Sequence, residues 1–340
     1  MATARVTPSR RSVLKWAGGG LLGLSALPVL SACGGGSSSS GGKYHGQIPA
    51  VDVKSVLSLA PYVVAHEAGL FKKHSLDLST VTSASGADIV RQAMSAAHLG
   101  IPASTEPIVA FASGAANLRV IASTYTAASL IFLVKNSSAI RSVADLRGKT
   151  VATSKPTALS TYFARSSVRK AGLDPDKDVK IQFIGGPPDV WSAVQNGLAD
   201  CCWSIAPLAT QLVSEGKARV LFTAADVQAN WIDNVVVADA GFLKSDGDTV
   251  RAVLTAMGEA VELIQNDPKR AGTLWATFAG ADVDATVAAM KQSGKNFNLS
   301  VDQSAMKAVA QAVKEEGLVK SIPDIASMVD TSYLPKQFQE

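Results

Sequence analysis

The chain has 340 residues, of which 47% are hydrophobic, 18% charged and 6% aromatic, and its formal net charge is +4. A chain of this length and composition can form two medium-sized domains, each with its own hydrophobic core. Four basic residues and no acidic residue lie in the first 32 positions, so the rest of the chain is close to neutral. This charge balance excludes the strongly basic class of proteins that bind nucleic acid.

The first 32 residues have the pattern of an export signal. Arg10, Arg11 and Lys15 precede an apolar stretch over residues 16–30. As a helix this stretch would be roughly 22 Å long, shorter than the ~30 Å hydrocarbon core of a membrane, which favours a secretory signal over a membrane span. The stretch SRRSVLK resembles the twin-arginine signal, with Val13 where phenylalanine is commoner; an ordinary secretory signal is the alternative. We predict that residues 1–32 are removed on export.

Cys33 ends the stretch LSAC and is followed by a tract of glycine and serine. LSAC resembles the bacterial lipobox, whose cysteine is lipidated and becomes the first residue of the mature protein. The Gly/Ser tract cannot bury side chains and is typical of a flexible linker. We therefore expect a lipidated tether over residues 33–50 that anchors the protein at the outer face of the cytoplasmic membrane. A structural cysteine beside a linker is the alternative.

The two other cysteines, Cys201 and Cys202, are neighbours in the sequence. They are too close for an ordinary disulfide bond, so we expect two buried thiols on opposite faces of a strand; a strained vicinal disulfide is the alternative. The sequence has no CxxC and no HxxxH motif and only four histidines. We therefore expect neither a metal site nor a cofactor.

Strands and helices are expected to alternate after the tether. The hydrophobic patterns predict strands at 53–60, 76–83, 99–104 and 118–125, with helices at 61–75, 87–97 and 106–115. Such alternation is typical of an α/β fold in which helices cover both faces of a mainly parallel sheet.

A second α/β unit is expected to interrupt the first. A long strand at 129–137 leads into it, and the apolar run at 234–242 returns the chain, after which the pattern is helical. We predict lobe I from residues 51–132 and 238–340, including a helical C-terminal extension packed on its outside, and lobe II from residues 133–237. Two crossings near 130–138 and 233–240 would form a hinge, with a ligand cleft between the strand ends of the two sheets.

Several blocks of the sequence, in this order and spacing, are similar to the solute-binding proteins of ABC importers for sulfonates, taurine, nitrate and thiamine-pyrimidine precursors. The blocks are PYVVAHEAGLFKKHSLDL, SASGADIV, AMSAAHLGIPASTEPIVAF, DLRGKTVATSK, ARSSVRKAGLDPDKDVKI and VQNGLADCCWSIAPLATQLV. They cover about residues 53–223. The resemblance implies the two-lobed periplasmic-binding-protein type 2 fold. LGIPAS departs from the family, which often has aspartate and an aromatic residue there, and this departure leaves the ligand class open.

Three predicted helix starts carry hydroxyl groups that could bind an acidic ligand. Unpaired amides and the helix dipole at such ends favour anions, although plain N-capping explains the same residues. Glu106 either complements its helix dipole or accepts hydrogen bonds from an amino group on the ligand. Aromatic residues at strand ends offer stacking faces, whereas we expect Trp231 to be a structural plug. The candidate ligand-binding residues are Tyr62, Ser85, Gly86, Ser104, Thr105, Glu106, Tyr125, Thr157, Ser160, Thr161 and Trp203.

The sequence therefore predicts an exported, lipid-anchored protein that binds a small organic solute and delivers it to the permease subunits of an ABC importer. We expect a monomer with no catalytic residues. A thiamine-pyrimidine synthase-like enzyme on the same fold is one alternative, with His66 on the first helix as its candidate residue, although a surface histidine explains the same position. A lipid-anchored sensor that presents the ligand to a receptor is the other alternative.

Overall fold

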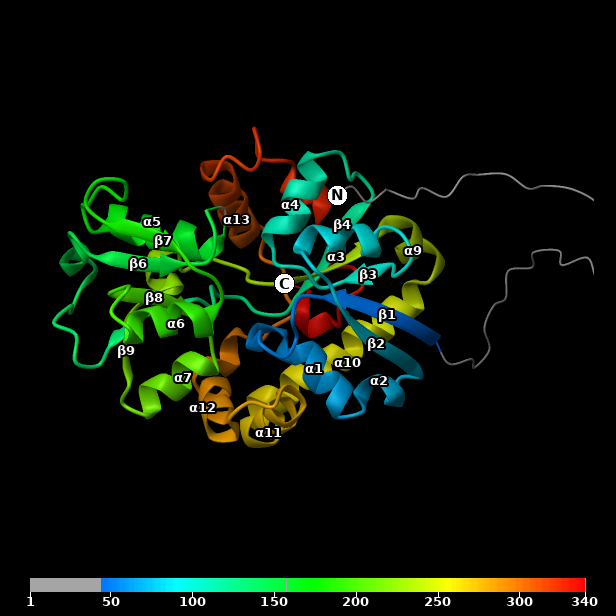
Figure 1. Ribbon diagram of the computed structural model, residues 1–340. Helices are drawn as coiled ribbons and strands as arrows, with labels where there is room; N and C mark the ends of the chain where they lie inside the picture. The colour runs from blue at the N-terminus through cyan, green and yellow to red at the C-terminus, as the bar shows by residue number, and fades with distance from the viewer. Residues whose placement is uncertain (1–43, 157, 340) are drawn as a thin grey trace, which may run out of the picture. The chain divides into compact units, whose positions relative to one another are not determined.

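The computed structural model describes residues 44–156 and 158–339, so the predicted signal peptide and Cys33 lie outside the described residues. The described strands form three sheets (Figure 1). The described residues belong to one compact unit, and the two predicted lobe boundaries therefore stay a prediction. Sheets and helices follow one another along the chain, which confirms the predicted α/β class.

The first sheet pairs β1 (Tyr44–Ala50) in parallel with β2 (Leu76–Thr82). Its first strand lies in the segment that was predicted to be tether, so the prediction that the tether extends to residue 50 is wrong. The physical reason is the apolar end of β1, where Ile48 and Ala50 are buried in the core. The tether can therefore extend no further than the residue before Tyr44.

The strand predicted at 53–60 is also wrong, because this run forms the 3-10 turn η1 (Leu57–Leu59) and the start of α1 (Ala60–Glu67). Pro61 stands in the first turn of α1, where its fixed φ favours the helix and its missing N–H is not needed. Every residue of the run from Leu57 to Ala65 is buried. A short run that is buried on all sides has the same pattern in a strand and in a helix.

The second sheet has the order β3–β10–β4, with β10 (Val235–Asp239) antiparallel to both neighbours. Its edge strands are β3 (Leu99–Gly100) and β4 (Leu118–Ser123). The helices beside this sheet are α3 (Gly86–Ala93) and α4 (Thr105–Ala112), whereas α2 (Leu70–Lys73) lies on β2 of the first sheet.

The third sheet has the order β7–β6–β8–β5–β9. Its strands are β5 (Ile131–Lys135), β6 (Thr150–Thr153), β7 (Lys180–Phe183), β8 (Cys201–Ser204) and β9 (Ala218–Thr223). The strand β6 is parallel to β7 and β8, whereas β5 is antiparallel to β8 and β9. The first sheet is thus parallel, the second antiparallel and the third mixed, so the sheets are not mainly parallel as predicted. The strands β5 and β10 lie at the predicted crossings, and both run against their neighbours.

The helices of the third sheet and of the C-terminal region complete the fold. They are α5 (Leu159–Lys170), α6 (Pro187–Gln195), α7 (Leu208–Ser214), α8 (Ala224–Val227), α9 (Ala240–Ser245), α10 (Gly247–Asn266), α11 (Pro268–Ala279), α12 (Val283–Ser293), α13 (Gln303–Glu315) and α14 (Ile325–Met328). Short 3-10 turns are η2 (Val143–Leu146), η3 (Gly294–Asn296) and η4 (Lys336–Phe338).

The C-terminal helices pack against both halves of the fold. The helices α10 and α11 lie on α1, as expected for an extension of lobe I. The helix α12, however, contacts α7, which follows β8 of the third sheet (Figure 1). The helix α13 contacts α4, and its buried face belongs to the same core cluster as Phe163 of α5. The C-terminal extension therefore packs on the helices of the third sheet as well as on α1 beside the first sheet.

The strand β8 carries two buried cysteines that face different core clusters. Cys201 belongs to the core cluster that contains Phe132 and Phe163, whereas Cys202 belongs to the cluster that contains Leu133 and Trp191. Both thiols are free, so the prediction of two buried thiols on opposite faces of a strand is confirmed. Burial raises the pKa of Cys202 to about 12 and that of Cys201 well above its usual value, so neither is a thiolate at neutral pH. Within the described residues, every helix is too short or too polar to cross a membrane.

Candidate functional site

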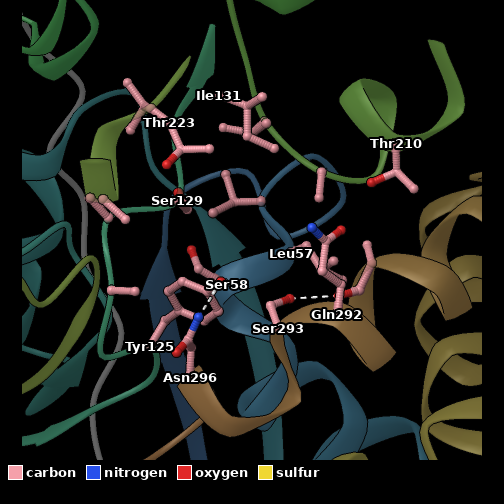
Figure 2. Close-up of a pocket in the computed structure, with 18 of the residues that line it drawn as sticks. Leu57, Ser58, Tyr125, Ser129, Ile131, Thr210, Thr223, Gln292, Ser293 and Asn296 are labelled. Atoms are coloured by element: carbon pink, nitrogen blue, oxygen red, sulfur yellow. Dashed lines mark hydrogen bonds between the residues drawn. The ribbon is translucent and has the colours of Figure 1, made fainter. Parts of the chain in front are cut away.

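A cavity of about 220 Å³ lies where segments from the different sheets meet (Figure 2). Four segments form its walls: the turn before α1, the connection from β4 to β5, the segment after β8, and the end of α12 with η3. Two further lining residues are Thr223, at the end of β9, and Ala225, which comes after it. The lining residues are Val56, Leu57, Ser58, Tyr125, Ala127, Ala128, Ser129, Leu130, Ile131, Ile205, Ala206, Thr210, Thr223, Ala225, Ala289, Gln292, Ser293, Asn296 and Phe297.

The cavity wall is mostly apolar, with hydroxyl and amide groups between the apolar side chains. Leu57, Ile131 and Ile205 belong to the apolar part. None of the described lining residues is Lys, Arg, His, Cys, Asp or Glu. A small concave apolar site with a few polar groups is what a small-molecule site needs, because apolar contact supplies affinity and polar groups fix orientation.

Tyr125 forms an aromatic side of the cavity. Its ring meets Phe297 edge-on, with the ring centroids 5.1 Å apart, and its hydroxyl accepts a hydrogen bond of 3.3 Å from Asn296 Nδ2 (Figure 2). Burial raises the pKa of this tyrosine, so the phenol stays neutral. Among the predicted site residues that the structure describes, Tyr125 is the one that lines the cavity.

Two serines on the cavity wall bond to a buried acid and a buried amide at the second crossing. Ser58 Oγ donates to Asn234 Oδ1 over 2.7 Å, and Ser129 Oγ donates to Asp233 Oδ2 over 2.8 Å. Asp233 is only 6% exposed. Burial raises the pKa of Asp233, and the hydrogen bonds from the Ser129 hydroxyl and backbone N–H partly oppose that effect. None of these four residues is among those predicted from the sequence. The signal was the pair of polar residues directly before the apolar run of β10.

A second group of predicted residues comes together at the starts of α3 and α4, outside the cavity lining. Gly86 allows close contact there, because an added Cβ would lie 2.3 Å from Cγ of Glu106. Thr105 Oγ1 donates to Glu106 Oε2 over 2.7 Å. Burial raises the pKa of Glu106, while the positive charge of Lys155 on the β6–α5 connection lowers it in part. Ser85 caps α3, with its hydroxyl donating to Asp88 Oδ2 over 2.7 Å.

Three predicted hydroxyl groups are fully buried and bonded within the protein. Ser104 donates to the carbonyl oxygen of Ile232 over 2.6 Å. Ser160 lies 2.8 Å from the hydroxyl of Ser154, and Thr161 Oγ1 lies 2.8 Å from Thr153 Oγ1. The structure therefore gives these hydroxyls structural roles, because each holds a helix start against its neighbouring segment. Thr157 lies outside the described residues.

Tyr62 and Trp203 do not line the cavity either. Tyr62 is a core residue of α1, with its hydroxyl 2.8 Å from Thr80 Oγ1, and burial raises its pKa to about 12. Trp203 is partly buried on β8 and donates from Nε1 to the carbonyl oxygen of Gly185 over 3.2 Å. In this structure both residues make packing contacts within the protein, and their contact with a ligand stays a prediction.

His66, the candidate residue of the enzyme alternative, is exposed on α1, and its Nδ1 lies 2.8 Å from Glu67 Oε1. A surface histidine paired with a neighbouring acid is therefore what the structure places there. Trp231 is 1% exposed, which agrees with its expected role as a plug.

The family profile described as NMT1/THI5 like matches residues 57–271. The chain belongs to the NMT1/THI5-like family. The matched range includes the cavity walls before α1, between β4 and β5, and after β8 and β9. The wall from α12 of this NMT1/THI5-like chain lies beyond the matched range.

The family match is accompanied by a curated relative in Escherichia coli strain K12, named as an aliphatic sulfonates-binding protein. It is 28% identical over 183 residues, which is 54% of this chain and 56% of the relative. The alignment thus spans little more than half of that protein's length.

Solved structures share the fold. The periplasmic aliphatic sulphonate binding protein SsuA from E. coli superposes with a TM-score of 0.72 at 23% identity, covering 84% of this chain and 92% of its own. The desulfurization enzyme DSZB superposes with a TM-score of 0.68 at 15% identity, covering 85% of this chain and 97% of its own. The NMT1/THI5-like chain therefore has the periplasmic-binding-protein fold predicted from its sequence, and that fold is shared with an enzyme.

Proposed function

We propose that this protein is an extracytoplasmic solute-binding protein that captures a small organic solute in the cavity beside Tyr125 and delivers it to the permease of an ABC importer. The cavity itself carries the proposal, because residues from different sheets meet there around space for a small molecule. The family membership and the name of the E. coli relative support the same function. They also make aliphatic sulfonates and taurine-like compounds the first solutes to test.

An enzyme on this fold is a second candidate, because DSZB has the same fold. The described lining residues do not favour it, since they offer hydroxyl and amide groups but no histidine, thiol or acid for proton transfer or nucleophilic attack. A sensor that presents its solute to a receptor would use the same cavity. Co-purification of the protein with permease subunits distinguishes delivery from sensing.

The test of solute capture is binding accompanied by compaction. We expect a saturating solute to reduce the radius of gyration measured by small-angle scattering, because a ligand favours the closed state only through contacts that exist in that state. Binding is first measured by thermal shift and isothermal titration, using a panel of taurine, other sulfonates and aminopyrimidines. We expect the hinge near residues 132 and 237, where the predicted lobe boundaries lie. A solute that saturates the protein while the radius of gyration stays constant contradicts capture between two lobes.

Export and anchoring through Cys33 are part of the proposal. We expect the mature protein to fractionate with membranes, and the Cys33→Ala variant to appear in the soluble fraction or as an uncleaved precursor, because several acyl chains on one cysteine anchor a protein stably. The measurement is membrane fractionation together with intact mass of the processed chain. The matched control is Ser37→Ala, in the same Gly/Ser tract. Unchanged processing and unchanged membrane association of Cys33→Ala would refute lipid anchoring.

A further inference from the structure

Two lining serines, Ser58 and Ser129, donate their hydroxyl protons to Asn234 and Asp233 behind them and so turn only lone pairs toward the cavity; these four residues are called here the acceptor wall. We propose that the acceptor wall selects solutes that carry a hydrogen-bond-donating nitrogen, such as an ammonium or an exocyclic amine, at the end that meets Ser58 and Ser129. This inference rests on the proposed solute-binding function and narrows its ligand class.

The direction of two hydrogen bonds is the first step. A serine hydroxyl has one proton and two lone pairs. Ser58 directs its proton to Asn234 Oδ1, and Ser129 directs its proton to Asp233 Oδ2. Both serines also line the cavity, where Figure 2 shows them on the same side as Tyr125. With their protons held by the residues behind them, the two hydroxyls present lone pairs to a solute.

The second step is the charge behind the serines. Asp233 is buried, and within the described part of the chain none of its recorded partners is a lysine, arginine or histidine. A buried carboxylate without a positive partner is unfavourable, so it is neutralised by a proton, which its raised pKa favours, or stabilised by hydrogen bonds and by a cationic group on a ligand. Ser129 connects this carboxyl directly to the cavity, so a positively charged group on the solute would lie one hydrogen bond away from it.

The third step is the rest of the lining. The described lining residues include no basic side chain, so a bare sulfonate or carboxylate would enter a site without a cation to receive it. The amide of Gln292 and the hydroxyl of Thr210 lie on other segments and can bind a polar second end of the solute. Leu57, Ile131 and Ile205 suit a short apolar middle. An aminoalkane sulfonate or a small aminated heterocycle combines these features, whereas a plain alkane sulfonate lacks the donor.

The experiment uses two pairs of probes that differ only in the nitrogen: taurine with ethanesulfonate, and 4-aminopyrimidine with pyrimidine. Each is titrated calorimetrically into the full mature chain, after unfolding and refolding to remove any co-purified solute. We expect the parent to bind the amino-bearing member of at least one pair ~10-fold or more tightly than its partner, since charge-assisted bonds in a closed site are strong. Asp233→Asn should remove most of this preference while leaving the amino-free member within ~2-fold.

Two single variants keep the test decisive if Asp233→Asn fails to fold. Ser58→Ala and Ser129→Ala each remove one hydrogen-bond acceptor for the solute's N–H. Each should reduce the preference for the amino-bearing probe by ~3-fold or more. Ser167→Ala is the matched control, because Ser167 is a buried serine of α5 that bonds to the carbonyl oxygen of Ala164 away from the cavity. It should bind every probe as the parent does.

The outcomes separate the two proposals. If sulfonates bind but the amino-free member of each pair binds as tightly as its partner, the acceptor wall does not select a donor and the inference is wrong. The same holds if the preference is unchanged in the Ser58, Ser129 and Asp233 variants, or if only solutes without a donor nitrogen bind. If no member of the whole solute panel binds, the solute-binding function itself fails and the inference fails with it.

Discussion

Ser293→Trp should abolish solute binding, with an expected loss of at least ~100-fold in affinity, or about 2.7 kcal/mol, because an indole would occupy much of a cavity of small-molecule size. Ser293 lies at the end of α12 and its side chain faces the cavity (Figure 2). Isothermal titration with the tightest-binding member of the solute panel measures the loss. Circular dichroism and the melting temperature establish that the variant is folded.

The matched control for this prediction is Lys291→Trp. Lys291 lies two residues earlier on the same helix, but its side chain is exposed and does not line the cavity. The control should therefore bind the solute as the parent does. Parent-like affinity in a folded Ser293→Trp protein would place the solute site elsewhere, with the Gly86–Glu106 contact at the starts of α3 and α4 as the next place to look.

Trp231→Ala should lower the free energy of unfolding by about 3 to 5 kcal/mol, the usual range for deleting a fully buried aromatic side chain. Trp231 packs edge-on against Phe163 with ring centroids 5.0 Å apart, and it stacks on Tyr162 at 6.2 Å. These two residues lie on α5, so the indole fixes the second crossing to the third-sheet half. Chemical denaturation of parent and variant measures the difference.

Two further variants show whether the loss comes from packing. The indole N–H of Trp231 is buried and has no hydrogen-bond partner among the described residues. Trp231→Phe loses no hydrogen bond and should therefore be clearly less destabilising than Trp231→Ala. Phe183→Ala is the surface control, because Phe183 is 49% exposed, and its effect should stay within about 0.5 kcal/mol. A Trp231→Ala effect no larger than that of Phe183→Ala would show that the aromatic cluster contributes nothing to stability.

The sequence predicts most of this fold because most elements have a clear hydrophobic period. The helices α10 and α13 and the strand β4 are examples. The wrong strand at 53–60 has a physical cause, which is that burial on all sides removes the hydrophobic period. The run from Leu57 to Ala60 is buried both as a turn and as a helix start, so its apolar pattern cannot distinguish them from a strand. The direction of β5 and β10 also depends on their distant partners.

The site was harder to predict than the fold, because local sequence does not show where a hydroxyl proton goes. Ser85 and Thr161 stand at helix starts, where hydroxyl groups that bind an anion are expected. Their hydroxyls instead bond to Asp88 and Thr153, which lie only a few residues away in the chain. Ser58 meets Asn234, 176 residues later in the chain. Such a contact becomes visible only once the sheets are assembled. Tyr125 was predicted because an aromatic residue at a strand end is a signal that the sequence does contain.

The wall of the cavity formed by α12 has a consequence for how solute preference can change between related proteins. The family profile ends at residue 271, before α12 begins at Val283, whereas the acceptor wall and Tyr125 lie inside the matched range. The α12 side of the cavity is therefore encoded C-terminal to the segment that carries the acceptor wall and Tyr125. Exchanging only the C-terminal segment between relatives would give chimeras that share the acceptor wall and Tyr125 and differ in the wall formed by α12. New specificities could then arise by recombination at one junction, without any change at the two crossings.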